Sequence, residues 1–216
     1  MFNNILVFTP VRFIKKKVNN DILVDDITNQ IIIGVLLGDS RVDKQKVNYN
    51  SRLCFEQGEL NKDYLFHLFE ILKPFCGVTH PTFRTKLNKE NNKLKYSYLF
   101  KTLSYPCFNY YYYLFYSNGS KIVPSNIEQL LTPVGLAYWA MDDGGKSSTA
   151  FNLHTQGFTH SEVVLLVKVL KDKFDLDCNI HSERDYYKIY IKTDSMVKFK
   201  LLVSPHFHPS MMYKLA

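Results

Sequence analysis

Apolar residues recur at helical spacing in several stretches of the chain, and the order of these stretches repeats. Residues 26–38 form a largely apolar run that predicts a helix. A second run, 132–143, begins with Thr132-Pro133, a favourable N-cap followed by proline at the first helical position. Residues 61–73 and 160–173 carry apolar positions three and four apart, which is typical of amphipathic helices. Each half of the chain is therefore expected to contain an apolar helix followed by an amphipathic one.

Alternation of apolar and polar residues predicts strands between these helices. The expected strands are 81–87 and 93–103, after strand-like sequence ending at Glu56, and then 149–156, 176–182 and 186–193 in the second half. Helices at about 107–116 and 194–203 close the two halves. Each half thus has the order α-β-β-α-β-β-α, an α/β (α+β) fold with antiparallel sheets.

The repeat suggests a division of the chain into four parts. We expect an N-terminal extension at 1–24, a first half at 25–118, a linker at 119–131 and a second half at 132–216. A strong turn signal, Asn118-Gly119, lies at the boundary between the first half and the linker. Because so small a half would be only marginally stable alone, the two halves are expected to pack together.

The polar residues of the predicted strands fall on one face, since successive side chains in a strand point to opposite sides. In the first half these residues are Arg84, Lys86, Lys93, Lys95 and Lys101. In the second half they are Asn152, His154, Asn179, His181, Tyr186, Lys188, Tyr190 and Lys192. An ordinary solvated face is the alternative, but two such faces in matching places favour phosphate contact and readout of base edges. The different compositions predict an asymmetric recognition site.

Composition narrows the class of partner. The chain has 27 Lys and Arg against 20 Asp and Glu, a formal charge of +7, which favours a polyanion, nucleic acid first and anionic membrane second. No apolar run is long enough to span a membrane. The four cysteines are scattered, which argues against a zinc ribbon or a disulfide framework. Abundant Asn, Lys, Ile, Phe and Tyr, which have A/T-rich codons, point to an organelle such as the mitochondrion.

Two short segments carry the chemistry. The sequence from Leu136 to Gly144, LAYWAMDDG, resembles the nine-residue LAGLIDADG motif, and the sequence from Ile32 to Ser40, IIGVLLGDS, resembles it more loosely. The first copy departs from the motif at Leu37 and Ser40. On these motifs, and over nearly the whole chain, the protein is similar to the LAGLIDADG homing endonucleases of the single-chain, two-motif, intron-encoded type.

The resemblance implies that the two motif helices lie side by side, in close contact at small residues. The small residues are Gly34 and Gly38 on one helix and Ala137 and Ala140 on the other. Each helix ends in an acid, Asp39 or Asp143, at the negative end of its dipole. The pair is expected to hold Mg²⁺, with Mn²⁺ or Ca²⁺ able to replace it in binding. Each acid alone could be a mere turn residue, and Asp142 is expected at a solvent or packing position.

Four further residues receive roles from the same resemblance. Lys121 and Lys214 stand where the family keeps a basic residue in the active site, to stabilise phosphate charge or organise the attacking water, with surface lysines as the alternative. Glu56 and Gln156 end the first long strand of each half, where the family often has a water-ordering polar residue. The expected activity is metal-dependent cleavage of both strands of a long, asymmetric double-stranded DNA site by a monomer that needs no protein partner or membrane. The alternatives are an intron RNA maturase and an inactive nucleic-acid-binding protein.

Overall fold

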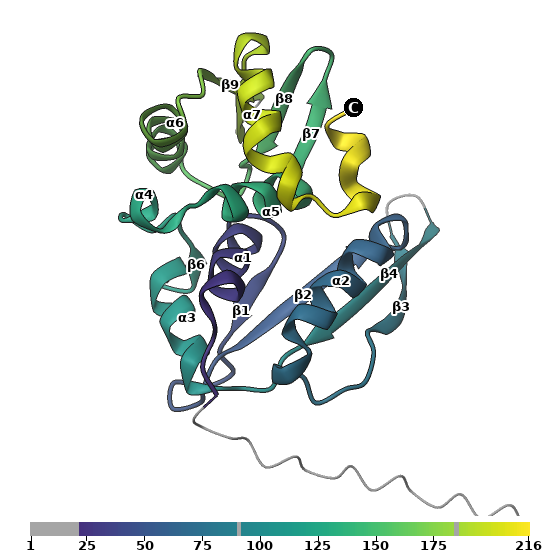
Figure 1. Ribbon diagram of the computed structural model, residues 1–216. Coiled ribbons are helices and arrows are strands. Elements are labelled where there is room, and N and C mark those ends of the chain that lie inside the picture. The colour runs from purple at the N-terminus through teal and green to yellow at the C-terminus, as the bar shows by residue number, and fades with distance from the viewer. Residues whose placement is uncertain (1–21, 90–91, 184–185) are drawn as a thin grey trace, which may run out of the picture.

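Two helices lie side by side in the middle of the molecule (Figure 1). The computed structural model describes residues 22–89, 92–183 and 186–216. The central helices are α1 (Asp26–Leu37), capped by the side chain of Asp25, and α5 (Pro133–Asp143), capped by that of Thr132. Nearly every residue of both helices after the first turn is buried, which explains why both are apolar on all sides rather than along one stripe.

A four-stranded antiparallel sheet accompanies each central helix. The first sheet has the order β1-β2-β4-β3, built from β1 (Arg41–Asp43), β2 (Arg52–Gly58), β3 (Thr82–Asn88) and β4 (Lys93–Lys101). The second has the order β7-β8-β10-β9, built from β7 (Gly144–Ser147), β8 (Ala150–His154), β9 (Cys178–Glu183) and β10 (Tyr186–Ile191). The strand orders correspond one to one, which confirms the expected α+β fold of two pseudo-symmetric halves.

Further helices cover the inner faces of the sheets and connect the halves. They are α2 (Lys62–Leu72), α3 (Asn109–Phe115), α4 (Ile127–Leu130), α6 (His160–Phe174) and α7 (Met196–Val203). Short 3₁₀ turns lie at Glu59–Asn61, Lys73–Phe75, Pro106–Phe108, Thr193–Ser195, Ser204–His206 and Pro209–Lys214. Helix α6 starts at a capping box of Thr159 and Glu162, and the same Glu162 carboxylate accepts the backbone N–H of Val123 at 2.9 Å. The linker is thereby tied to the second half.

The apolar core runs without interruption through both halves. Ile32 and Leu36 of α1 and Trp139 of α5 are completely buried, as are Phe151 and Phe199 in the second half. A core shared in this way provides the burial that neither half could supply alone. In the described part of the chain, no helix combines the length and the apolar character needed to cross a membrane.

The segment after α5 differs from the prediction in its strands. The helix ends before Gly144-Gly145 as expected, but these glycines begin a strand that the pattern did not predict, β7, and the strand expected at 149–156 is β8, which ends at His154. A Cβ on Gly144 would lie 2.2 Å from the carbonyl oxygen of Ala140 and 2.4 Å from the ring of Phe151. Glycine is therefore present because the strand must pass this close to the helix end and the core. Most of the proposed extension at 1–24 lies outside the described residues.

Candidate active site and nucleic-acid interface

The two central helices touch through backbone atoms. A Cβ on Gly34 of α1 would lie 2.2 Å from the carbonyl oxygen of Gly135 of α5. One turn further along α1, a Cβ on Gly38 would lie 2.5 Å from the Cβ of Asp142. Since both contacts advance toward the C-terminus of each helix, the helices run in the same direction and end together. We call this contact line the seam.

The seam corrects one sequence-based expectation. Gly34 and Gly38 are on it as predicted, but their partner on α5 is Gly135 and not Ala137 or Ala140. With about 100° between successive residues of a helix, Ala137 and Ala140 point well away from the side that carries Gly135 and Asp142. Both alanines are completely buried in the core instead.

The acids stand directly beyond the seam, where both helices end. Asp39 lies two residues beyond the last residue of α1, directly after the C-cap Gly38, and Asp143 is the last residue of α5. Burial, and then the negative charge of Asp39, raises the pKa of Asp143 to about 7. Two carboxylates from different halves are therefore close enough to repel each other, an arrangement that a bound cation would relieve.

Asp142 is neither exposed nor a simple packing residue. Its side chain is buried against Gly38, and burial followed by the charge of Asp39 raises its pKa well above the usual value. The amide nitrogen of Gln57 donates to the Asp39 carboxylate at 3.1 Å and also lies 3.5 Å from Asp142. The Asp142 Oδ2 atom is buried without a hydrogen-bond partner among the described residues. Gln57 thus links the active-site ends of both halves.

The two lysines expected in the active site occupy equivalent places. The Lys121 ammonium donates to the carbonyls of Gly38 at 2.6 Å and Ser40 at 3.0 Å, at the end of α1. The Lys214 ammonium donates to the carbonyls of Met141 at 2.5 Å and Asp142 at 3.2 Å, at the end of α5. Each lysine therefore binds the negative end of one motif helix beside its acid. Burial lowers the pKa of both ammonium groups, and the neighbouring aspartates oppose that shift.

Local turns explain how these lysines reach the helix ends. Asn118 and Gly119 both have positive φ and join β5 (Tyr116–Ser117) to β6 (Ser120–Lys121) in a tight hairpin. The linker that was predicted to start here thus begins as a hairpin that delivers Lys121. Lys214 is delivered by the last 3₁₀ turn, which starts where His208 accepts the backbone N–H of Ser210.

The two residues predicted to order water, Glu56 and Gln156, bond to side chains of their own halves. The Glu56 carboxylate accepts from the hydroxyl of Ser97 at 2.8 Å and pairs with Arg84 at 3.2 Å, on the outer face of the sheet. Glu56 thus lies on the polar face as predicted, but the next residue, Gln57, is the one that points inward to Asp39. Gln156 lies beyond the end of β8, and its amide bonds to the ring of His154 at 3.1 Å.

The strand register places the other polar residues as expected. On the first sheet Arg84 lies opposite Ser97, and Lys86 lies opposite Lys95. Residues opposite each other in adjacent strands share a face, and the same pairing extends this face to Lys93 and Lys101. On the second sheet the register places one set together: Asn152, His154, Asn179, His181, Tyr186, Lys188 and Tyr190. Lys192 lies beyond the end of β10.

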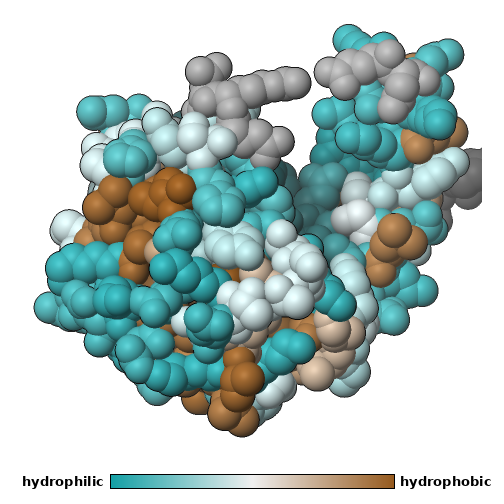
Figure 2. Space-filling view, turned by 90° about the horizontal axis from the view of Figure 1, so that it is seen from above, coloured by the Kyte–Doolittle hydropathy of each residue, from teal (hydrophilic) through white to brown (hydrophobic). Residues whose placement is uncertain are grey.

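Two lobes flank an open hollow in the space-filling view (Figure 2). The lobe on the right carries the β3–β4 hairpin, and the larger lobe on the left belongs mainly to the second half. The surfaces that line the hollow in this view are mostly hydrophilic. Two outer hairpins with polar faces on either side of an opening suit an extended, charged ligand.

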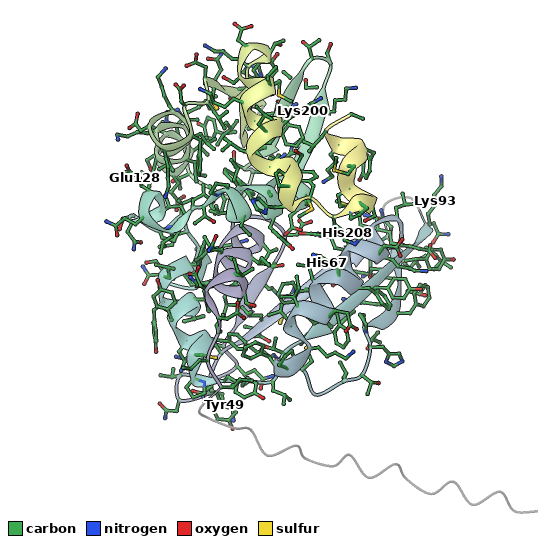
Figure 3. The ribbon with its side chains drawn as sticks, viewed as in Figure 1. Tyr49, His67, Lys93, Glu128, Lys200 and His208 are labelled. Carbon is green, nitrogen blue, oxygen red and sulfur yellow. The ribbon has the colours of Figure 1, made fainter. Side chains whose placement is uncertain are left out.

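A different crevice lies at the opposite end of the central helices. Its lining includes Ile27 and Ile31 from the first turns of α1, together with His67, Tyr138 and His208. His67 bonds to the hydroxyl of Tyr138 at 2.7 Å, and its ring lies 4.7 Å from that of His208 between their centroids. Figure 3 shows His67 and His208 facing each other between α2 and the second half. The contact of His67 with Tyr138 and His208 joins the two halves on the side of the crevice, away from the helix ends that carry the acids.

Comparison with known proteins agrees with this geometry. The model of the LAGLIDADG DNA endonuclease family matches residues 29–199. A cytochrome b mRNA maturase bI2 of Debaryomyces hansenii is 34% identical over 190 residues, which are 86% of this chain and 72% of that protein. A probable intron-encoded endonuclease 1 of Wickerhamomyces canadensis is 34% identical over 197 residues, 88% of this chain and 84% of that protein.

A solved structure shows the same similarity in three dimensions. The homing endonuclease I-WcaI bound to its DNA recognition sequence superposes with a TM-score of 0.83 at 32% identity, covering 88% of this chain and 86% of that one. The family match extends over both central helices and both sheets. With acids at the ends of two paired motif helices, this chain belongs to the LAGLIDADG DNA endonuclease family.

Proposed function

We propose that the protein is a monomeric homing endonuclease that binds a long, asymmetric DNA duplex across its two sheets and hydrolyses one phosphodiester bond on each strand. The observation that carries the proposal is the matched pair of helix ends, where Asp39 with Lys121 and Asp143 with Lys214 meet at the seam. Two equivalent centres held at one fixed separation suit two cuts in one duplex.

Asp39 and Asp143 would hold a divalent cation, and Mg²⁺ is the first choice because both donors are hard carboxylate oxygens. Among the described residues no group of three or more His, Cys, Asp or Glu side chains is placed to hold a metal. The two acids suit a site that backbone carbonyls, water and the phosphate of the DNA complete. When bound, the cation offsets phosphate charge and makes water a stronger nucleophile. Mn²⁺ or Ca²⁺ would replace it in binding.

The protein's own groups set the geometry around the acids. Lys121 and Lys214 fix the two helix ends through the backbone carbonyls and add positive charge where a phosphate would lie. Gln57 holds the Asp39 carboxylate in one orientation, which prepares it before DNA binds. We assign the role expected of Glu56 to Gln57 on this contact.

The names of the relatives support the proposal. The Wickerhamomyces canadensis relative is called a probable intron-encoded endonuclease, and the superposed I-WcaI structure contains its DNA recognition sequence. We infer that the gene of this chain lies in an intron too, and that the protein acts in an organelle, the mitochondrion first. A second function, assistance in RNA splicing, is favoured by the Debaryomyces hansenii relative, which is called an mRNA maturase.

A selection from a randomised duplex library followed by a cleavage assay tests the proposal. The protein should enrich one long, non-palindromic site and cut both strands with Mg²⁺, and EDTA should stop cleavage. Asp39→Asn and Asp143→Asn should each lose double-strand cleavage by a factor of about 10³ while still binding the site, because only a metal ligand is removed. Lys62→Ala, on the first turn of α2, is the control. Cleavage by either aspartate variant at the normal rate would refute the assignment.

A further inference from the structure

A carboxylate stands on the otherwise cationic outer face of the first sheet. Glu56 of β2 accepts from the Ser97 hydroxyl at 2.8 Å, and both its oxygens lie 3.2–3.4 Å from one terminal nitrogen of Arg84. Ser97 lies opposite Arg84 in the β3–β4 register, so three strands contribute to the cluster. Glu56 is about one-third exposed and Arg84 about half exposed.

A negative charge at this place is costly for a surface that contacts phosphates. A carboxylate repels the DNA backbone and so lowers general affinity for DNA. Its presence here therefore indicates another role. As a salt bridge it adds little stability, because both partners are partly exposed. The contact does orient the Arg84 side chain. Ser97 holds the Glu56 carboxylate, and the carboxylate in turn holds one nitrogen of the guanidinium, which restricts the directions in which the guanidinium can point.

The remaining donors of Arg84 match one base. A guanidinium has five N–H donors in a planar fork, and Glu56 engages only one of its nitrogens. The free edge can still offer two parallel donors, and guanine is the base that presents two adjacent acceptors, O6 and N7, in the major groove. A lysine cannot reproduce this fork, so Lys86 and Lys95 on the same face suit phosphate contact instead.

The position of the cluster specifies which part of the DNA it faces. Glu56 directly precedes Gln57, whose amide reaches Asp39 from the other side of the same strand. The cluster therefore lies near the cleavage centre, whereas Lys86 and Lys95 lie further toward the end of the β3–β4 hairpin.

We propose that Glu56 and Ser97 hold Arg84 as a rigid reader of one guanine in the half of the site bound by the first sheet, close to the cut. The inference rests on the proposed function, that this face binds DNA. It assigns base selectivity to a single position in a half whose other basic residues contact phosphate.

Binding of all single-base variants of the selected site, measured in Ca²⁺ without cleavage, tests this inference. We expect the wild type to prefer guanine at one position of this half-site by about tenfold or more. Arg84→Ala and Arg84→Lys should both reduce that preference to less than about threefold, the latter because charge alone is not sufficient. Lys86→Ala, the matched control on the same strand and face, should weaken binding to every sequence alike and keep the preference.

Glu56→Gln separates orientation from general affinity. It should reduce the guanine preference at the same position while leaving binding to unrelated DNA equal or stronger, since a negative charge is removed. A uniform loss with Arg84→Ala, an intact preference with Glu56→Gln, or a cytosine preference lost with Glu56→Gln alone would each overturn the inference. Base preference is read from binding, so a failure to cleave would refute the proposed activity and leave this readout intact.

Discussion

The outer face of the first sheet presents Arg84, Lys86 and Lys95, whereas the outer face of the second presents Asn152, Asn179 and His181. The helix ends between the sheets differ far less, since each has one acid and one lysine bound to its last carbonyls. The seam constrains side chains by close backbone contact, but an outward-facing strand position is free to change. The halves therefore differ in the side chains that they present on their outer faces, whereas both keep one acid and one lysine at the helix end.

The largest expected effect is a loss of stability, and it tests whether the seam holds the two central helices rigidly together. Gly34→Ala would force a Cβ to within 2.2 Å of the Gly135 carbonyl oxygen, so we expect it to lower the free energy of unfolding by about 3 kcal/mol or more. Gly58→Ala is the control, because its φ is −59° and nothing lies within 4 Å of the added Cβ. Urea unfolding of both variants measures the difference. Equal stabilities would show that the helices separate at little cost.

A second prediction concerns the cationic face. Replacing Lys93, Lys95 and Lys101 together by Ala should reduce the slope of log affinity against log salt by about 2 to 3 units, because fewer counterions are released from DNA. Replacing Asn152, Asn179 and His181 together by Ala should leave the slope nearly unchanged, since neutral groups release none. Fluorescence anisotropy over a salt series measures both. An equal change of slope in the two triple variants would show that the two sheets do not differ in their contacts with phosphate.

The third prediction sharpens the contrast in readout. Base substitutions under the second sheet should cost more per position than those under the first, roughly 1–3 kcal/mol for each lost bidentate contact, because Asn side chains pair with adenine edges. The Arg84 position is the one exception that we expect in the first half-site. Cleavage of every single-base variant of the site measures the costs. Greater stringency throughout the lysine-rich half would contradict the comparison.

The smallest expected effect concerns pH and the acid of the second half. The folded pKa of Asp143 is raised to about 7, so the folded state holds this proton more tightly than the unfolded chain does. Stability from this group is complete at acidic pH and is lost as pH rises from about 4 to 7. Without metal, Asp143→Asn should therefore be more stable than the wild type at pH 8, on the order of 2 kcal/mol, and much closer to it at pH 4.

Thermal melts in EDTA at both pH values measure this difference. Burial lowers the pKa of His67, which acts in the opposite sense and costs stability as pH falls below about 6.5. Because His67 is present in both proteins, the difference between them isolates Asp143. A difference that does not change with pH would mean that the acid is not perturbed by its surroundings.

Local periodicity predicted the parts of this molecule that depend on local geometry. The alternation around Lys93 and Lys95, and around Asn179 and His181, predicted the outward faces correctly because side-chain direction in a strand has a period of two. Thr132 and Pro133 likewise predicted the N-cap and the first residue of α5 correctly.

The errors concern relations between elements. That Gln57 and not Glu56 reaches Asp39 depends on which face of β2 covers the core, and a shift of one residue reverses that choice. That Gly135 meets Gly34 depends on how α5 is rotated against α1, which the composition of an all-apolar helix leaves open. The strand at Gly144-Gly145 was missed because paired glycines indicate a break, whereas here they allow a close approach.

The Gly34–Gly135 contact has a consequence for the product of the reaction. At these glycines the two backbones are in van der Waals contact, so the helices cannot move closer and a larger side chain would push them apart. The contact therefore sets the distance between their acids. The spacing between the two cuts is then the same for every DNA site that the sheets come to recognise. Variants with new target sequences should all leave single-stranded ends of one length, and an altered overhang should require a change at the glycines themselves.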